Sequence, residues 1–152
     1  MKPTSVQFRP YTAQDEGACL GIFDSNCPRF LDPSERDEFC DYIRYNADRA
    51  NYLVGELDGK VIACGGIFID TQNAAGFFAW GLVRSSHHRQ GIGSKLTQRR
   101  MEMARELGIK ALHLDTSQHT QGYYEKLGFV ATDTTPDGYG VGLHRIDMVK
   151  KL

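Results

Sequence analysis

The stretch VRSSHHRQGIGSKL, residues 83–96, is the most informative part of the chain. An apolar strand pattern at 77–83 runs into it, and a helical pattern at 91–107 begins inside it. Gly91 and Gly93, in the turn between them, remove side chains where backbone must approach a ligand closely. The first turn of a helix also offers unpaired N–H groups and the positive end of the helix dipole. The stretch therefore predicts an anion site, suited to phosphate, at the start of a helix.

Two other glycine motifs do not fit this turn. The dinucleotide-binding fingerprint needs another glycine three places after Gly93, where the chain has Leu96. A Walker loop needs Gly-Lys-Ser/Thr, whereas Ser94 follows Gly93. A tight strand-to-helix turn without a ligand stays open as the simpler alternative. Side chains near the turn supply cationic or donor groups: His87, His88, Arg89 and Lys95.

Outward from this turn, hydrophobic periodicity predicts elements in the order β-α-α-β-β-β-α-β-α-β-β. Asp58-Gly59 between two apolar runs indicates a tight hairpin, because both turn positions need positive φ. Gly108-Ile109 and Gly128-Phe129 are glycine-then-apolar helix ends of the Schellman type. The expected strands are 6–9, 52–57, 61–69, 77–83, 111–116, 129–132 and 143–149. The expected helices are 12–25, 33–47, 91–107 and 120–127.

These elements indicate an α/β (α+β) fold. Antiparallel strands come first, and the strand-helix-strand crossover around 91–107 then places two strands parallel. In the crossover helix, the apolar residues at helical spacing are Ile92, Leu96, Met103 and Leu107, as is typical of a core-facing side. No repeat or linker interrupts the sequence, so residues 1–152 are expected to form a single domain.

Composition argues against several classes of protein. Hydrophobic residues make up 41% of the 152 residues, which is ordinary for a globular domain with a buried core. A net charge of −1, without a block of like charges, favours neither a nucleic-acid nor a membrane-surface partner. The start of the chain lacks the apolar core of a signal peptide, and no apolar run is long enough to span a bilayer. The four cysteines have no CxxC spacing, so we expect no metal site, no disulfide framework and a cytoplasmic setting.

Two segments resemble motifs of a known enzyme family. Residues 88–93, HRQGIG, resemble motif A of the GNAT superfamily of acetyl-CoA-dependent N-acetyltransferases, in which Gln/Arg-x-x-Gly-x-Gly/Ala follows a long strand. His88 stands where Gln or Arg is usual. Residues 123–129, YYEKLGF, are similar to motif B of the same family, and the two motifs have the family's order and separation. The resemblance implies the GNAT fold, a mixed central sheet of six to seven strands flanked by about four helices.

The resemblance also implies where acetyl-CoA binds as cosubstrate. In the family, backbone N–H groups of motif A cradle the CoA diphosphate, and the end of the preceding strand pairs with the pantetheine arm. Ser117 and Thr120 stand where the family often has Asn and Ala, beside the pantetheine. The implied binding residues are Leu82, Val83, His88, Arg89, Gln90, Gly91, Ile92, Gly93, Ser94 and Ser117.

Tyr124, in motif B, is the candidate catalytic residue. Acetyl transfer needs a proton for the departing thiolate, and a phenol, which is protonated at neutral pH, can donate one. The alternative is that Tyr124 only packs, as Tyr123 is expected to. No general base is assigned, because the strand at 77–83 contains no acid. Other titratable candidates are better explained as capping, surface or strand-face residues: Asp70, Asp115, His119 and His113.

The implied function is direct transfer of an acetyl group from acetyl-CoA to a primary amine of a small molecule or peptide. In the GNAT fold the acceptor usually enters between the first two helices and the final hairpin, here residues 25–30 and 135–140. Arg29 could pair with a substrate carboxylate and Tyr139 could close over it, although a proline turn and a glycine-rich mobile loop explain these segments more simply. The alternative function is a CoA-binding sensor without catalysis. Dimers are common in the family, so a homodimer stays open as well.

Overall fold

The computed structural model describes residues 5–152. The expectations of a single domain and of no signal peptide also cover residues 1–4, which lie outside the described residues. The strands in this range are β1 (Gln7–Pro10), β2 (Leu53–Leu57), β3 (Lys60–Asp70), β4 (Ala75–Val83), β5 (Ala111–Thr116), β6 (Val130–Gly140) and β7 (Leu143–Lys151). The helices are α1 (Glu16–Ser25), α2 (Arg36–Asn46), α3 (Ile92–Glu106) and α4 (Gln121–Lys126). This order of elements is the predicted one. Within the same range, no helix combines the length and the apolar composition needed to cross a membrane.

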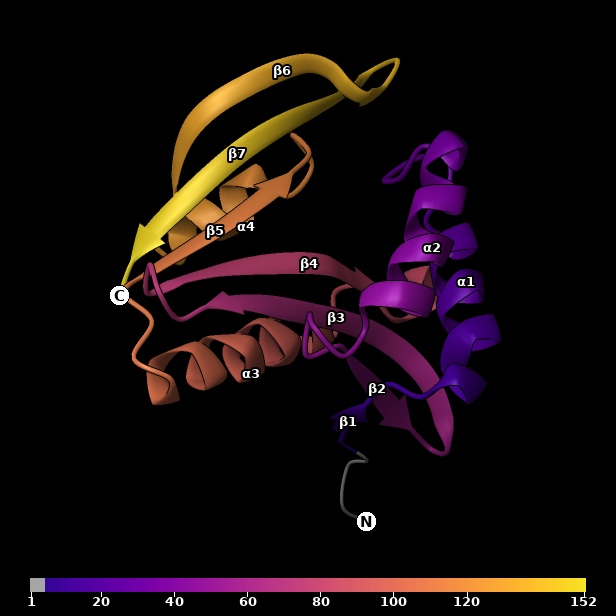
Figure 1. Cartoon of the computed structure of the whole chain (residues 1–152). Helices are drawn as coiled ribbons and strands as arrows, with labels where there is room; N and C mark the ends of the chain where they lie inside the picture. Colours follow the sequence, from indigo (N-terminus) through magenta and orange to yellow (C-terminus); the bar gives the residue numbers. More distant parts are fainter. Residues whose placement is uncertain (1–4) are drawn as a thin grey trace.

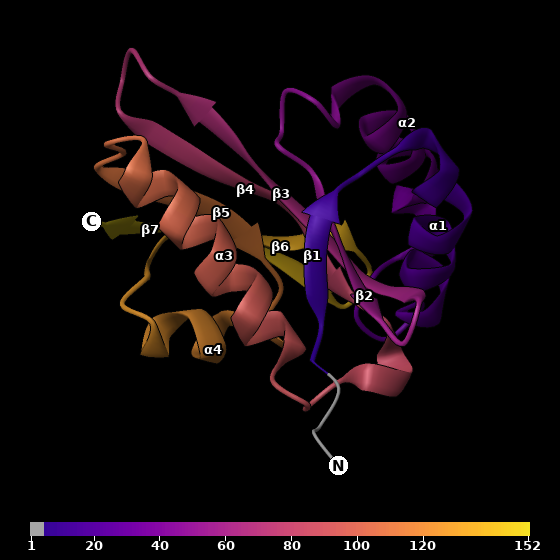
Figure 2. The same cartoon turned by 90° about the horizontal axis from the view of Figure 1, so that it is seen from below.

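The strands form one mixed sheet in the order β1-β2-β3-β4-β5-β7-β6. Neighbours are antiparallel except β4 and β5, which are parallel, as a strand-helix-strand crossover requires. α1 and α2 cover one face beside β2 to β4, whereas α3 and α4 lie on the other (Figure 1 and Figure 2). The predicted mixed sheet of six to seven strands with four flanking helices is therefore confirmed.

The parallel pair is short, and its shortness makes an opening in the sheet. Residues 75–77 of β4 pair with residues 111–113 of β5, and within the described chain the two strands pair no further. Both strands continue, to Val83 and Thr116, so their carboxyl ends separate (Figure 1). Open α/β sheets bind ligands at the carboxyl ends of their parallel strands. Motif A follows β4 and motif B follows β5 in α4, so the two motifs flank this opening.

The turns predicted from glycine signals are present. Both residues of Asp58-Gly59 have positive φ, 52° and 77°, which confirms the hairpin between β2 and β3. At the end of α3, the Ile109 N–H donates to the Ala104 carbonyl at 3.0 Å. At the end of α4, the Phe129 N–H donates to the Tyr124 carbonyl at 3.1 Å. Both helices therefore end in the predicted Schellman motif.

Two expectations about the packing need correction. The strand predicted at 129–132 is too short, because β6 pairs with β7 as far as Gly140 opposite Leu143. The segment 135–140 is therefore part of a long strand and not a free glycine loop. At the end of α3, Leu107 was expected to face the core but is 53% exposed. The residues that face the sheet are instead spaced four apart along the helix. They are Ile92, Leu96, Arg100 and Ala104.

Candidate active site

The start of α3 leaves backbone N–H groups without partners. Gly91 precedes the helix with a φ of 79°, and the Lys95 N–H donates to its carbonyl at 3.1 Å. The first turn contains no acidic residue, and no side chain of the described residues caps it. Its N–H groups therefore remain free at the positive end of the helix dipole. Proteins bind phosphate groups with this arrangement.

Glycine serves different purposes at the two motif positions. A Cβ on Gly91 would meet nothing within 4 Å, so glycine is needed there for its positive φ and not for space. A Cβ on Gly93 would lie 3.8 Å from Val83 Cγ2, an ordinary contact, so the protein's own packing does not require glycine there. The space above Gly93 is open to a ligand that approaches the backbone. Arg89 also has positive φ, 63°, a strained conformation that is common at binding sites. This open backbone fits a phosphate group.

The end of β4 presents backbone groups to the opening. The Arg84 N–H donates to the Ile62 carbonyl of β3 at 2.8 Å. Because backbone direction alternates along an antiparallel strand, the polar groups of Leu82 also face β3, and those of Val83 face β5. Of the two residues expected to contact pantetheine, Val83 therefore faces the opening and Leu82 does not.

The Val83 carbonyl is held from two sides. Asn26 donates from Nδ2 at 3.0 Å, and His88 contacts the same oxygen through Nε2 at 2.8 Å. A carbonyl only accepts hydrogen bonds, so Nε2 of His88 carries the proton. The His88 side chain is thus engaged within the protein. Asn26 lies in the predicted acceptor segment 25–30, but its hydrogen bond to Val83 was not predicted, because the partner lies 57 positions away and no local pattern marks the contact.

Motif B meets motif A at the opening. The Tyr123 hydroxyl on α4 donates to Ser94 Oγ in the first turn of α3 at 3.0 Å, so the expectation that Tyr123 only packs is wrong. Tyr124 is half-buried and packs edge-to-face against Phe129, with ring centroids 5.7 Å apart. Ser117, between β5 and α4, is only 7% exposed. The candidate residues of the two motifs therefore lie on two sides of one opening.

Arg100 on α3 is a buried cation that sequence analysis also missed. It is only 2% exposed, and burial lowers the pKa of its guanidinium. Its Nη1 donates to the Gly66 carbonyl at 3.2 Å, and its guanidinium carbon lies 4.0 Å from the centre of the Phe78 ring. The signal was present in the sequence, because Arg100 follows Ile92 and Leu96 by eight and four residues on one helix face.

The predicted acceptor segments reach the same opening. The Phe30 ring, between α1 and α2, packs edge-to-face against the rings of His88 and His119, with ring centroids 5.3 Å and 5.5 Å apart. It therefore contacts the loops that follow both β4 and β5. The Tyr139 hydroxyl on β6 donates to Asp115 on β5. Burial, and then the Asp115 charge, raise the pKa of Tyr139.

Other polar candidates have structural roles or lie apart. Asp70 accepts hydrogen bonds from Asn73 in a turn, which lower the pKa of Asp70. His113 stacks on Phe77 with ring centroids 4.9 Å apart, as expected for a strand-face residue. Arg29 is exposed beside the opening. Among residues 5–152, no cluster of three or more side chains is arranged to hold a metal ion.

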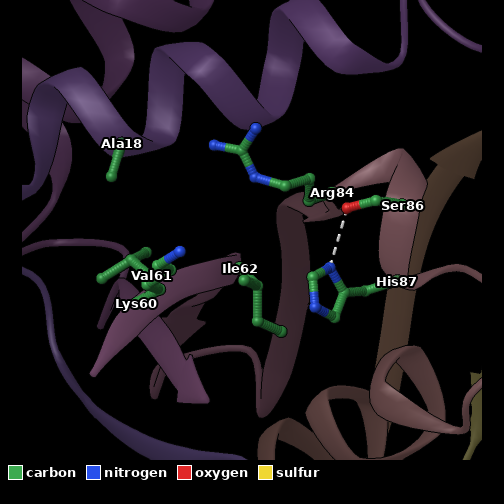
Figure 3. A pocket seen from close by; sticks show the side chains of 7 residues that line it. All are labelled: Ala18, Lys60, Val61, Ile62, Arg84, Ser86 and His87. Carbon is green, nitrogen blue, oxygen red and sulfur yellow. Dashed lines mark hydrogen bonds between the residues drawn. The ribbon is translucent and has the colours of Figure 1, made fainter. Parts of the chain in front are cut away.

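A cavity of about 560 Å³ lies between α1, the start of β3 and the segment just before motif A (Figure 3). Figure 3 shows the Arg84 side chain extending toward α1, and Ser86 Oγ bonded to His87 Nδ1 at 2.9 Å. The cavity is lined by Ala18, Lys60, Val61, Ile62, Arg84, Ser86 and His87. Neither Tyr124 nor the first turn of α3 lines it, so it is not the place for the chemistry of the motifs.

Comparison with known proteins agrees with this geometry. The pattern of the acetyltransferase (GNAT) family matches residues 17–129. An IAA acetyltransferase of Azospirillum brasilense is 33% identical over 126 residues, which cover 80% of this chain and 81% of the relative. The structure of the ribosomal-protein-S18-alanine N-acetyltransferase from Escherichia coli has a TM-score of 0.79 at 18% identity, covering 97% of this chain and 94% of that one. The structure of yncA from Salmonella typhimurium with its cofactor acetyl-CoA has a TM-score of 0.73 at 19% identity, with coverages of 97% and 94%.

The family match extends over most of the chain, and the relative from Azospirillum brasilense is similar along four fifths of it. The same range contains both motifs and the opening between β4 and β5. The chain therefore belongs to the acetyltransferase (GNAT) family and is an acyltransferase.

Proposed function

We propose that the protein transfers the acetyl group of acetyl-CoA directly to a primary amine of a small molecule or peptide. The observation that carries this proposal is the free first turn of α3, which meets motif B through the hydrogen bond from Tyr123 to Ser94. Free N–H groups at a helix start favour a diphosphate, which acetyl-CoA carries. Arg89 and Lys95 add positive charge beside the turn.

Tyr124 is the proposed proton donor. When the amine nitrogen bonds to the thioester carbon, the C–S bond breaks, its electron pair goes to sulfur, and the nitrogen releases one proton to water. The phenol proton of Tyr124 then neutralises the thiolate as it forms. The Val83 backbone, which faces the opening, is the proposed contact for the pantetheine arm. Positioning of the two reactants accounts for the rest of the rate enhancement in this proposal.

The acceptor is proposed to enter beside the contact between Tyr139 and Asp115. Burial raises the pKa of Glu35, and the nearby charges of Glu38, Asp32 and Asp115 add to this effect. Gly140 on β6 lies against Asp32, and Tyr139 on the same strand donates to Asp115, so carboxyl groups from the start of α2 and the end of β5 border one region. Such a group of acids attracts a cationic amine more than an anion. This charge supports an amine acceptor.

Turnover with a panel of amines tests the proposal. The protein is incubated with acetyl-CoA and with small primary amines, amino acids or peptides, and thiol release is measured together with the product mass. We expect release that depends on the amine and a product heavier by one acetyl group. The N-acetylated form of each amine is the matched control. Binding of acetyl-CoA without turnover across the panel would indicate the CoA-binding sensor, and absence of binding would contradict both functions.

A further inference from the structure

Arg100 is a buried cation without an anionic partner. Its side chain is 2% exposed, and no carboxylate among residues 5–152 forms an ion pair with it. Its Nη1 donates to the Gly66 carbonyl, and its buried Nε has no partner within the described chain. A buried charge that is not compensated destabilises the fold, so a role in the fold alone explains Arg100 poorly.

The strands make room for this guanidinium directly beneath the opening. A Cβ on Gly81 would lie 2.8 Å from Arg100 Nη2, so a side chain at that position would displace it. Gly81 follows Trp80, whose φ of 42° marks an irregular pairing of β3 with β4. Both residues belong to the part of β4 that no longer pairs with β5. The charge of Arg100 therefore lies under the segment of β4 that borders the opening.

Aromatic contacts connect Arg100 with the proposed proton donor. The guanidinium lies over the Phe78 ring. The ring centroids of Phe78 and Phe129 are 6.1 Å apart, and those of Phe129 and Tyr124 are 5.7 Å apart. Burial lowers the pKa of Arg100, and the electrostatic effect of the nearby Tyr124 phenol opposes this shift. The cation and the phenol therefore lie in one buried cluster.

We propose that Arg100 is a positioning residue that acts on acetyl transfer through Tyr124. It holds the Tyr124 ring in place through the packed rings of Phe78 and Phe129, and its charge stabilises the negative charge that the reaction creates. This inference rests on the proposed function. In the step concerned, the electron pair of the C–S bond goes to sulfur and the Tyr124 proton moves to that sulfur. The phenolate left behind is then stabilised by the neighbouring cation until it regains from the solvent the proton that the amine nitrogen released.

A double-mutant cycle of kcat tests the coupling. Arg100→Met removes the charge with similar bulk and is expected to lower kcat about thirtyfold when Tyr124 is present, but less than about threefold in the Tyr124→Phe background. Arg100→Lys keeps a charge and is expected to retain at least about a third of kcat. The Kd of acetyl-CoA is expected to stay within about threefold in all of these variants.

Two controls separate this role from a structural one. Ile109→Val removes one buried methyl group near α3 and is expected to lower Tm without changing kcat. Calorimetry with free CoA in buffers of different ionisation enthalpy gives a readout that needs no acceptor. Wild-type protein is expected to release more protons on binding CoA than Arg100→Met, because the cation favours the bound thiolate.

The outcomes distinguish this inference from the proposed function. Equal loss of kcat in both backgrounds, or equal proton release by wild type and Arg100→Met, would overturn the role of Arg100 while acetyl transfer stands. Failure of the wild-type protein to bind acetyl-CoA would overturn the proposed function and this inference with it. A large loss of kcat confined to the Tyr124 background, with partial rescue by lysine, would support it.

Discussion

The starts of α1 and α2 differ from the start of α3. Before α1, the Asp15 carboxylate accepts from the Thr12 N–H at 2.8 Å, and before α2, Asp32 accepts from the Ser34 N–H at 3.0 Å. α3 begins at Gly91 with neither an acid in its first turn nor a side-chain cap from the described residues. The acids before α1 and α2 bond backbone N–H groups of the turns that lead into these helices, whereas the first turn of α3 keeps free N–H groups for an external anion. The difference separates a helix end that stabilises the fold from one available for binding.

The strongest way to break this comparison is to give α3 an acidic start. Ser94→Asp places a carboxylate where the diphosphate is proposed to bind. Two like charges about 4 Å apart near a protein surface repel by roughly 4 kcal/mol, so the Kd of acetyl-CoA is expected to rise on the order of a thousandfold. Calorimetry measures the change. Ser94→Asn is the uncharged control, and equal binding by the two variants would contradict an anion site at this helix start.

Tyr124→Phe tests whether α3 only binds the cosubstrate while α4 supplies the chemistry, because the variant changes a side chain on α4 alone. Loss of the proton donor is expected to lower kcat about a hundredfold and to leave the Kd of acetyl-CoA within about twofold. Thiol release measures kcat, and calorimetry measures Kd. Tyr123→Phe is the matched control, because it removes only the hydrogen bond to Ser94 and is expected to weaken binding about fivefold at most. Wild-type kcat in Tyr124→Phe, with chemistry limiting the rate, would remove this residue from the mechanism.

The smallest expected effect concerns the acidic start of α1. The hydrogen bond from Arg9 lowers the pKa of Asp15, so the folded state holds this carboxylate more firmly deprotonated than the unfolded state does. The resulting stability is complete above the usual aspartate pKa near 3.8 and is lost as the pH falls through the lower folded value. Arg9→Met is expected to cost about 1 kcal/mol at pH 7, because Arg9 is partly open to water.

The free energy of unfolding in urea at pH 7 and pH 3 checks this expectation. The difference between wild type and Arg9→Met is expected to shrink at pH 3, while both proteins bind acetyl-CoA equally at pH 7. A change in the Kd of acetyl-CoA would show that the start of α1 is not limited to stabilising the fold.

Local signals were sufficient to predict the order of elements. Asp58-Gly59 marks its hairpin through two positive φ values, and Gly108 and Gly128 mark two helix ends, because each of these signals lies within a few residues of the turn it forms. The length of β6 was not predicted, because it depends on pairing with β7 and on no local turn signal. The sequence therefore predicted the order of the elements, but not the length of β6, which pairing with β7 determines.

The motifs of the candidate site were predicted from the sequence, but the tertiary contacts that hold the site together were not. Gly91 and Tyr124 stand in recognisable segments. Asn26 and Phe30 lie in the predicted acceptor segment, but the contacts that hold them at the opening are distant in sequence and were not predicted. Arg100 was passed over for a different reason, because a charged residue does not count as core in a hydrophobic pattern even when its spacing turns it inward. Sequence patterns thus identify residues that belong to a motif, but they do not identify polar residues that become buried through tertiary packing.

Calorimetric titration of the protein with acetyl-CoA and, separately, with acetyl-pantetheine most directly tests whether the free start of α3 grips the diphosphate. The two ligands share the thioester and the arm, but only acetyl-CoA carries the diphosphate. We expect acetyl-pantetheine to bind at least about a hundredfold more weakly, since the charge-assisted hydrogen bonds at the helix start are lost. Equal Kd values for the two ligands would contradict the account.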